Sequence, residues 1–352
     1  MTQTKAVPEE IIDPALPIID PHHHLWDRSM FVGTPALAQP EHPFQRVMNF
    51  AARYLLDEFL ADLNSGHAIK ATVFLECHSM LKTEGEPETR YLGETEFVNG
   101  VAAMSASGIY GPTKVCAGIV GNVPLTVGAR AGELLDRHVH AGGGRFRGVR
   151  NSASWDADAG VLGPIGRQGA GLYLDPKFRE GFAELGKRGL SFDAWMLEPQ
   201  LPDLIDLARA FPGTAIVLDH VGTPLGMSTY AGRREERFDI WAKNIRELAK
   251  CQNVSVKLGG LAMVFCGFAS TRPARDATSA EMAKEWTPYI ETCIEAFGAQ
   301  RCMFESNFPV DGVTCTYPTL WNALKRMAKG YSADEKADLF FNTANRFYRL
   351  GL

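Results

Sequence analysis

The stretch IIDPHHH, residues 18–24, joins a short β-branched run to three consecutive histidines. Such a run is typical of a buried strand, and polar side chains directly after it are typical of the carboxyl rim of a parallel barrel. Side chains alternate along a strand, so His22 and His24 face one side and His23 faces the other. Histidine is scarce here, with nine in 352 residues. We therefore interpret His22 and His24 as a pair that can converge on one metal ion or one substrate oxygen.

Short apolar runs recur along the chain, with helical patterns between them. The predicted strands are Ile18–His24, Ile69–His78, Val115–Val123, Phe146–Ser152, Leu190–Leu197, Ala215–Val221, Val254–Leu261 and Arg301–Phe308. Phe178–Arg188 and Leu201–Phe211 show apolar residues at helical spacing. This alternation predicts an α/β protein with a parallel sheet, and eight such units predict a closed (β/α)8 TIM barrel. An open doubly wound sheet is the alternative, but no Gly-x-Gly-x-x-Gly fingerprint supports it.

The chain is longer than a typical barrel of about 250 residues. We expect residues 1–17 to form an N-terminal extension and residues 18–352 to form one barrel domain. The additional length lies in polar segments that follow predicted strands. These segments are Arg28–Asn64, Met80–Thr113, Ala153–Pro176 and Met263–Pro288. Such segments emerge on the carboxyl face of a barrel, so we expect long loops that cover a selective pocket there.

The composition excludes several classes of partner. Hydrophobic residues make up 45% and charged residues 22%, the mix of an ordinary globular protein. A net charge of -5 provides no basic field for nucleic acid, and no run of about 18 apolar residues can span a membrane. The polar N-terminus lacks the apolar core of a secretory signal, and seven cysteines without a C-x-x-C pattern are typical of buried free thiols. We therefore expect a cytoplasmic protein with a small-molecule substrate, and a homodimer is the common oligomer.

Two further segments place polar groups at strand ends. In LDHVG, residues 218–222, His220 ends a buried run, and a core histidine bonded to backbone is the alternative interpretation. In RCMFESNFP, residues 301–309, polar groups interrupt an apolar run. Glu305 and Asn307 are two residues apart and face the same way. A strand that ends in solvent is the alternative, but the carboxyl rim is also where catalytic groups gather.

Together these segments resemble the amidohydrolase-related family of the amidohydrolase superfamily, most closely its lactonase branch, which includes 2-pyrone-4,6-dicarboxylate lactonase and sugar lactonases. The branch carries Asp-x-His-x-His, matched at residues 20–24, and Leu-Asp-His-x-Gly-x-Pro, matched at residues 218–224. It also carries Gly-Val-Arg, matched at residues 148–150, and Val-Lys-Leu, matched at residues 256–258. The resemblance covers residues 18–348 and implies a barrel hydrolase whose active site is built around these histidines.

One motif departs from this family. Its last strand reads Gly-Ser-Asp-Trp-Pro, where this chain has ESNFP, so the family's general-base aspartate is Asn307 here. An amide has no basic lone pair near neutrality, although Asn307 can still orient a water or a carbonyl. Glu305 is one candidate for the base, because burial raises the pKa of an unpaired carboxyl. Glu305 can instead be a buried partner of Arg150 or Lys257, and Asp311 is a third candidate base.

Five other side chains occupy inward or rim positions in this pattern. They are Trp26, Glu76, Arg150, Asp193 and Lys257, and we predict that they bind substrate. The planar fork of Arg150 suits a substrate carboxylate. A lysine among apolar neighbours needs a partner charge, so an internal Glu76–Lys257 ion pair explains those residues equally well. Trp26 can form a pocket wall or simply pack.

These observations predict a hydrolase that opens a sugar-derived or carboxylated lactone. His22, His24 and His220 would polarise the carbonyl oxygen, either directly or by holding one divalent cation, zinc or manganese. The superfamily's usual histidine on the fifth strand is missing, so a site without metal is the other expectation. Two alternatives to a lactonase stay open. One is a metal-dependent decarboxylase of the same superfamily, and the other is a catalytically inactive ligand-binding barrel.

Overall fold

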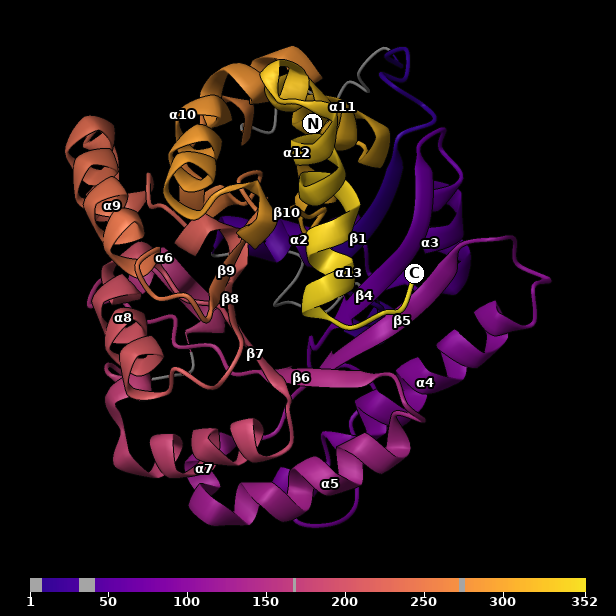
Figure 1. Ribbon diagram of the computed structural model, residues 1–352, viewed down its shortest axis with the longest axis vertical. Coiled ribbons are helices and arrows are strands. Elements are labelled where there is room, and N and C mark those ends of the chain that lie inside the picture. The colour runs from indigo at the N-terminus through magenta and orange to yellow at the C-terminus, as the bar shows by residue number, and fades with distance from the viewer. Residues whose placement is uncertain (1–7, 32–41, 167–168, 272–275) are drawn as a thin grey trace.

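A ring of eight parallel strands is surrounded by helices in the computed structural model, which describes residues 8–31, 42–166, 169–271 and 276–352 (Figure 1). In order round the sheet the strands are β1 (Pro17–His23), β4 (Ala68–Leu75), β5 (Lys114–Gly121), β6 (Phe146–Arg150), β7 (Ser191–Ala194), β8 (Ile216–Leu218), β9 (Val254–Leu258) and β10 (Cys302–Phe304). Each neighbouring pair in this order is parallel. The predicted (β/α)8 TIM barrel is confirmed.

The ring is joined between its first and last strands by the residues just beyond β10. The backbone N–H of His24 donates to the carbonyl of Phe308 at 2.8 Å, and that of Asn307 donates to the carbonyl of His22 at 2.9 Å. The histidine motif and the ESNFP motif, nearly 300 residues apart in the chain, are therefore neighbours across this seam.

Helices cover the outside of the ring (Figure 1). They are α2 (Arg46–Phe50), α3 (Leu56–Leu63), α4 (Leu92–Ala106), α5 (Ala131–Ala141), α6 (Ala159–Leu162), α7 (Pro176–Lys187), α8 (Leu201–Ala210), α9 (Arg234–Leu248), α10 (Ser279–Phe297), α11 (Tyr317–Met327), α12 (Ala333–Ala337) and α13 (Thr343–Phe347). A short antiparallel pair, β2 (Trp26–Asp27) and β3 (Arg53–Tyr54), lies outside the barrel sheet. Long segments after strands are thus partly helical, and α4 occupies much of residues 80–113.

Two apolar clusters hold the barrel together. The larger one lies between the strands and the surrounding helices. The smaller one joins inward residues of several strands, such as Ile19, Val73 and Val217, to Ala344 and Tyr348 near the C-terminus. The C-terminal segment therefore packs against the same cluster as the inward strand residues, and this brings the Tyr348 hydroxyl within reach of the polar centre described below.

Several strands end earlier than the sequence predicts. The predicted strand Ala215–Val221 is observed as Ile216–Leu218, because His220 and Val221 take the left-handed conformation with φ of 57° and 48°. The predicted strand Arg301–Phe308 is observed as Cys302–Phe304, and Asn307 beyond it has φ of 55°. The chain leaves the ladder where its polar side chains begin, and this change of direction aims them into the site.

Other expectations from the sequence have mixed outcomes. All seven cysteines are free thiols, and six are buried while Cys77 is partly exposed. Among the described residues, no helix combines the length and apolar character that a membrane crossing requires. Residues of the predicted N-terminal extension contact the barrel helices, since Glu9 accepts a hydrogen bond from the backbone of Ser279 at 2.7 Å. The division at residue 17 stays a prediction.

Candidate active site

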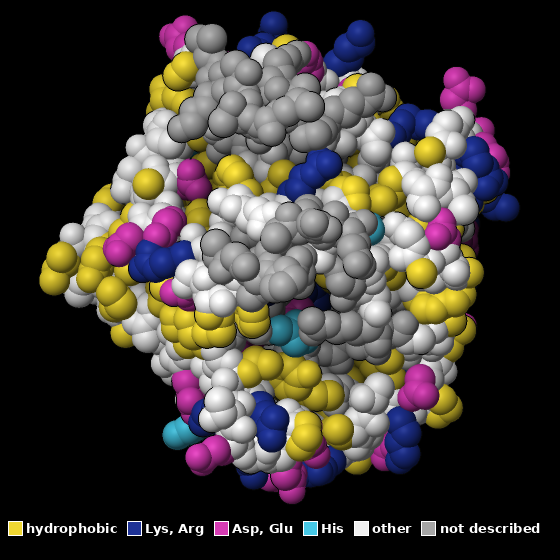
Figure 2. All heavy atoms as spheres, turned by 180° about the vertical axis from the view of Figure 1, so that it is seen from behind, with side chains coloured by type: hydrophobic (Ala, Val, Ile, Leu, Met, Phe, Trp, Pro, Cys, Tyr) yellow, Lys and Arg dark blue, Asp and Glu magenta, His cyan; other side chains and the backbone are white. Residues whose placement is uncertain are grey.

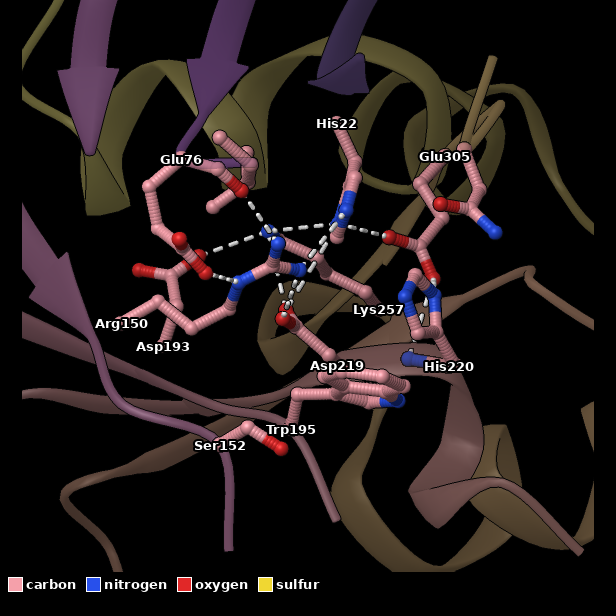
Figure 3. Close-up of polar contacts among 12 residues, drawn as sticks. His22, Glu76, Arg150, Ser152, Asp193, Trp195, Asp219, His220, Lys257 and Glu305 are labelled. Carbon is pink, nitrogen blue, oxygen red and sulfur yellow. Dashed lines mark hydrogen bonds and ion pairs between the residues drawn. The ribbon is translucent and has the colours of Figure 1, made fainter. Parts of the chain in front are cut away.

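Side chains from seven of the eight barrel strands, all but β5, meet at the carboxyl ends of those strands (Figure 3). Eight of the predicted site residues belong to this network: His22, His24, Glu76, Arg150, Asp193, His220, Lys257 and Glu305. Two groups can be separated within it. The imidazole group comprises His22, His220 and Glu305, and the ion-pair group comprises Glu76, Arg150, Asp193, Asp219 and Lys257.

Glu305 lies between two imidazole rings in the imidazole group. Its Oε1 accepts hydrogen bonds from His220 Nδ1 at 2.7 Å and from the His220 backbone N–H at 3.0 Å. Its Oε2 lies 2.7 Å from His22 Nδ1, yet it accepts no aligned hydrogen bond from the described residues. All three side chains are buried. Among the described residues, the polar contact of Oε2 of this carboxylate is therefore the His22 ring.

Two glycines after β9 make room for this arrangement. A Cβ on Gly259 would lie 2.4 Å from Glu305 Cγ, and a Cβ on Gly260 would lie 2.4 Å from His220 Cγ. Gly260 also has φ of +66°, a conformation that side chains rarely adopt. The Gly259–Gly260 pair is thus required for the approach of Glu305 to His220.

In the ion-pair group each carboxylate lies beside a fixed cation. Lys257 Nζ is 2.7 Å from Asp193 Oδ2 and 3.0 Å from Asp219 Oδ1. Arg150 is 2.7 Å from Glu76 through Nε and 3.5 Å from Asp219 through Nη1. All five residues are buried. Burial at this depth is tolerated because each charge has an opposite charge beside it.

The pKa values in the ion-pair group follow from this pairing. Burial is the largest effect on Asp219 and raises its pKa, but neighbouring groups, Lys257 and Arg150 among them, together outweigh burial and hold the pKa below its ordinary value. Burial likewise lowers the pKa of Lys257, but Asp193 and Asp219 together raise it above its ordinary value. For Asp193 burial dominates and raises the pKa to about 6. Lys257 is therefore a permanent cation at neutral pH.

His22 stands between the two groups. Lys257 Nζ lies 3.2 Å from its Nδ1, and Arg150 Nη1 lies 3.3 Å from its Nε2. Burial, and then the positive charge of Lys257, lower the pKa of His22 well below its ordinary value. The ring is neutral at physiological pH, so it can bind through a lone pair but carries no charge of its own.

The histidine triplet alternates as the sequence predicts. His24 is oriented toward the site, with its ring 5.0 Å from that of His22, and its Nδ1 lies 2.8 Å from the carbonyl of Leu75. His23 points elsewhere, stacks on Phe59 and hydrogen-bonds Thr72. A carbonyl only accepts, so His24 Nδ1 carries the ring hydrogen, and burial lowers the pKa of the ring well below its ordinary value. His24 Nε2 is therefore a lone-pair donor.

Comparison with known proteins places the chain in a family. The model of the Amidohydrolase family matches residues 113–350. The chain belongs to the amidohydrolase family. This amidohydrolase is 33% identical over 342 residues to the protein y4mH of Sinorhizobium fredii (strain NBRC 101917 / NGR234), which is 95% of this chain and 98% of that one. It is 26% identical over 333 residues to an L-fucono-1,5-lactonase of Burkholderia multivorans (strain ATCC 17616 / 249), which is 94% of this chain and 96% of that enzyme.

A solved structure supports the fold of this amidohydrolase. A Burkholderia multivorans amidohydrolase with bound zinc superimposes with a TM-score of 0.68 at 24% identity, and the match covers 94% of this chain and 99% of that one. The predicted resemblance to the amidohydrolase superfamily and its lactonase branch is confirmed, and the protein is a hydrolase of this superfamily.

Two predicted residues of this amidohydrolase lie at the edge of the network. Trp26 stacks near His24 with ring centroids 6.0 Å apart, and its Nε1 donates to the carbonyl of Ala51. Asn307 donates through Nδ2 to Asp311 Oδ1 at 2.8 Å. Burial raises the pKa of Asp311 to about 7. The roles of Trp26 and Asn307 stay predictions.

The partners of the buried charges differ from those that the sequence suggests. Glu76 pairs with Arg150, and Lys257 pairs with Asp193 and Asp219, so no Glu76–Lys257 pair forms. Glu305 contacts imidazoles in place of the two cations considered for it. The guanidinium of Arg150 donates to the side chain and the backbone carbonyl of Glu76. Glu76 therefore takes up donors of the Arg150 guanidinium that were expected to bind a substrate carboxylate.

Three residues of the network were not predicted to act there. Asp219 contacts both Lys257 and Arg150. The sequence could have indicated it, because this carboxylate lies between a buried apolar run and the candidate residue His220. Tyr348 donates its hydroxyl to Asp193 Oδ2 at 2.6 Å, but no local pattern marks it. His78 lies 3.3 Å from Glu76, and its side chain is 40% exposed. His78 therefore connects the buried network to the surface.

The face opposite to that in Figure 1 shows polar side chains in a recess. Histidine, basic and acidic atoms are visible there together, with hydrophobic side chains beside them (Figure 2). Small-molecule sites are usually hollows with apolar walls and a few convergent polar groups.

The residues present can hold a divalent cation. His22, His220 and Glu305 offer one ligand atom each within 4.8 Å of one another, and two imidazoles with a carboxylate are a known catalytic set for zinc. Glu305 Oε2 is a buried acceptor without a hydrogen bond. The two groups together contain more carboxylates than fixed cations, so a buried cation would balance their charge. The donor set therefore fits a metal ion, although it differs from the predicted His22, His24 and His220 by having Glu305 in place of His24.

Proposed function

We propose that this amidohydrolase opens a lactone ring by adding water to its carbonyl carbon. The observation that carries the proposal is the Glu305 carboxylate held between His22 and His220 at the carboxyl ends of the barrel strands. Similarity to an L-fucono-1,5-lactonase along almost the whole chain supports it.

Glu305 acts as the general base in this proposal. Its Oε1 already accepts two hydrogen bonds from His220, so Oε2 is the oxygen that takes the proton of the attacking water. The water oxygen bonds to the carbonyl carbon, the bond from that carbon to the ring oxygen breaks, and the proton then passes from Glu305 to the leaving oxygen. General acid–base catalysis of this kind contributes about 10²–10⁴-fold in rate.

The histidines serve as lone-pair donors in this proposal. His220 Nδ1 donates to a carboxylate and His24 Nδ1 donates to a carbonyl. An imidazole in its neutral form that donates through Nδ1 has no hydrogen on Nε2. A nitrogen without hydrogen cannot donate to the substrate carbonyl, but it can bind a cation or accept a substrate hydroxyl. This favours indirect polarisation by a divalent ion that the imidazole nitrogens of His22 and His220 would hold, which leaves Glu305 Oε2 to take the proton of the water. Such an ion, when bound, polarises a carbonyl oxygen and lowers the pKa of bound water.

A neutral, hydroxylated lactone fits the described centre better than a carboxylated one. Both fixed cations of the ion-pair group, Arg150 and Lys257, are already matched by carboxylates. An added substrate carboxylate would increase the excess of negative charge in a buried site, which is unfavourable. Sugar-derived lactones carry hydroxyls that the free imidazole nitrogens can bind, so we expect them as substrates.

The test combines metal analysis with a hydrolysis screen. Protein purified without chelators is assayed for zinc and manganese, then for acid release from aldonolactones and pyrone carboxylates, before and after metal removal. We expect about one metal ion per chain, faster release from aldonolactones, and activity that is lost on removal and restored on readdition. Full activity in metal-free protein would refute the metal assignment. No release from any lactone with metal present would refute the lactonase, and assays for released carbon dioxide and for ligand stabilisation would then separate a decarboxylase from an inactive barrel.

A further inference from the structure

A hydrogen-bonded pair lies directly beyond β10, at the position where the general base of the resembled family is absent. Asn307 Nδ2 donates to Asp311 Oδ1 at 2.8 Å, and both side chains are buried. The other oxygen of Asp311, Oδ2, accepts from the backbone N–H of Ala262 at 3.3 Å. The pair thus connects the segment after β10 with the segment after β9.

This contact fixes the orientation of the Asn307 amide. Asp311 Oδ1 accepts from the amide nitrogen and Asp311 Oδ2 accepts from the backbone of Ala262, so the nitrogen of the amide faces Asp311 and Asn307 Oδ1 faces the other way. Among the described residues, none donates a hydrogen bond to Asn307 Oδ1. The amide therefore presents one oriented acceptor oxygen.

The pair borders the imidazole group. The backbone N–H of Asn307 donates to the carbonyl of His22, and Asn307 is two residues beyond Glu305. Asn307 has φ of 55°, a left-handed conformation that asparagine and aspartate tolerate better than other non-glycine residues.

We infer that Asp311 is a positioning residue that holds the Asn307 amide so that Oδ1 accepts a hydrogen bond from the attacking water. This inference rests on the proposed function. The water donates one hydrogen to Asn307 Oδ1 and the other to Glu305 Oε2, which leaves an oxygen lone pair for the carbonyl carbon. Glu305 removes the proton, and Asn307 sets the direction of attack. The chain has thereby separated two tasks that a single aspartate can perform together.

The pair offers a reciprocal exchange as a test. In Asn307→Asp, two carboxylates would face each other at 2.8 Å, which is unfavourable in a buried site. In the double variant N307D/D311N, the amide nitrogen at position 311 can donate to the carboxylate at position 307 while the amide oxygen accepts from Ala262, so every hydrogen bond of the wild type has an equivalent. Aspartate is also compatible with the backbone at position 307.

The experiment measures kcat, KM and Tm for the wild type, N307D, D311N and N307D/D311N. We expect N307D to lose about 10- to 100-fold in kcat with KM nearly unchanged, and the double variant to recover most of the loss. N307D as active as the wild type would overturn the inference. Recovery of Tm without recovery of kcat would also overturn it, because the pair would then serve only the fold.

Failure of the proposed function is distinguishable from failure of this inference. A wild type that opens no lactone rejects the proposed function, whereas the Tm values of the four proteins still test the pair without any substrate. Non-additive Tm changes, with the double variant more stable than the sum of the two single changes implies, support the oriented amide. Additive changes would show that Asp311 does not hold Asn307 and would overturn the inference.

Discussion

The imidazole group and the ion-pair group are equally buried, but their carboxylates face different partners. Glu76, Asp193 and Asp219 lie beside Arg150 or Lys257, whose charges are permanent. Glu305 lies beside imidazoles, which can bind a proton or a metal ion and release it again.

This difference in partners gives the two groups different roles, one in stability and one in the reaction. Fixed ion pairs inside a barrel hold their shape, and removal of one partner leaves an uncompensated buried charge. A carboxylate between imidazoles can accept a proton during a reaction, because its partners do not fix its charge. We therefore assign the fold of the centre to the ion-pair group and the reaction to the imidazole group.

The largest expected effect on the fold comes from Lys257→Met, which removes the cation shared by Asp193 and Asp219. We expect the free energy of unfolding, measured by urea denaturation, to fall by about 3–5 kcal/mol. Lys325→Met is the matched control, because Lys325 is also buried but donates to the backbone carbonyls of Ile12 and Asp13. Equal losses in the two variants would contradict the special role of the ion-pair group.

A smaller effect, on activity, is expected from His24→Ala. The ring of His24 borders the imidazole group, so we expect kcat/KM on the best lactone to fall about 100-fold. His23→Ala is the control, since His23 packs on Phe59 away from the site and its loss should lower stability more than activity. Full activity in His24→Ala would show that the motif's second site-facing histidine takes no part in the reaction.

The smallest effect concerns Glu94, a buried carboxylate in neither group. It accepts hydrogen bonds from the backbone of Cys77 and Ser79, and burial raises its pKa to about 8. Between its ordinary pKa of 4.5 and about 8 the folded state binds more protons at this site than the unfolded state, so the contribution of Glu94 to stability falls as pH rises through this window.

Glu94→Gln should remove that pH dependence. We expect its Tm to exceed that of the wild type by on the order of 2 °C at pH 9, with a smaller difference at pH 5. Thermal unfolding at both pH values measures the change. A Tm difference between Glu94→Gln and the wild type that is the same at pH 5 and pH 9 would mean that Glu94 is ionised at both pH values. This buried carboxylate would then need no fixed cation beside it.

Much of the barrel could be predicted from local patterns. Apolar runs marked all eight strands, and the period of two correctly separated His22 and His24 from His23. The strand ends were less predictable, because residues in the left-handed conformation, such as His220 and Asn307, end the hydrogen-bonded ladder early. No sequence pattern predicts the left-handed conformation for a histidine.

The partners of the buried charges could not be predicted from the strand pattern. Arg150 and Asp193 are direct neighbours in the register of β6 and β7, yet Arg150 pairs with Glu76 and Asp219 while Lys257 takes Asp193. Many strands converge on one rim, so several pairings satisfy the same pattern and side-chain reach decides among them. The contact from Tyr348 depends on how the C-terminal segment packs against the inward residues of the barrel strands, which no local motif encodes.

The most direct test of the account is the rate of lactone opening by Glu305→Gln, with Glu94→Gln as the matched buried control. Glutamine keeps the size of Glu305 but cannot take a proton from water. We predict that kcat of Glu305→Gln falls about 10³-fold while the protein stays folded, and that Glu94→Gln keeps the wild-type rate. A folded Glu305→Gln variant that opens the lactone as fast as the wild type would contradict the assignment of the reaction to the imidazole group.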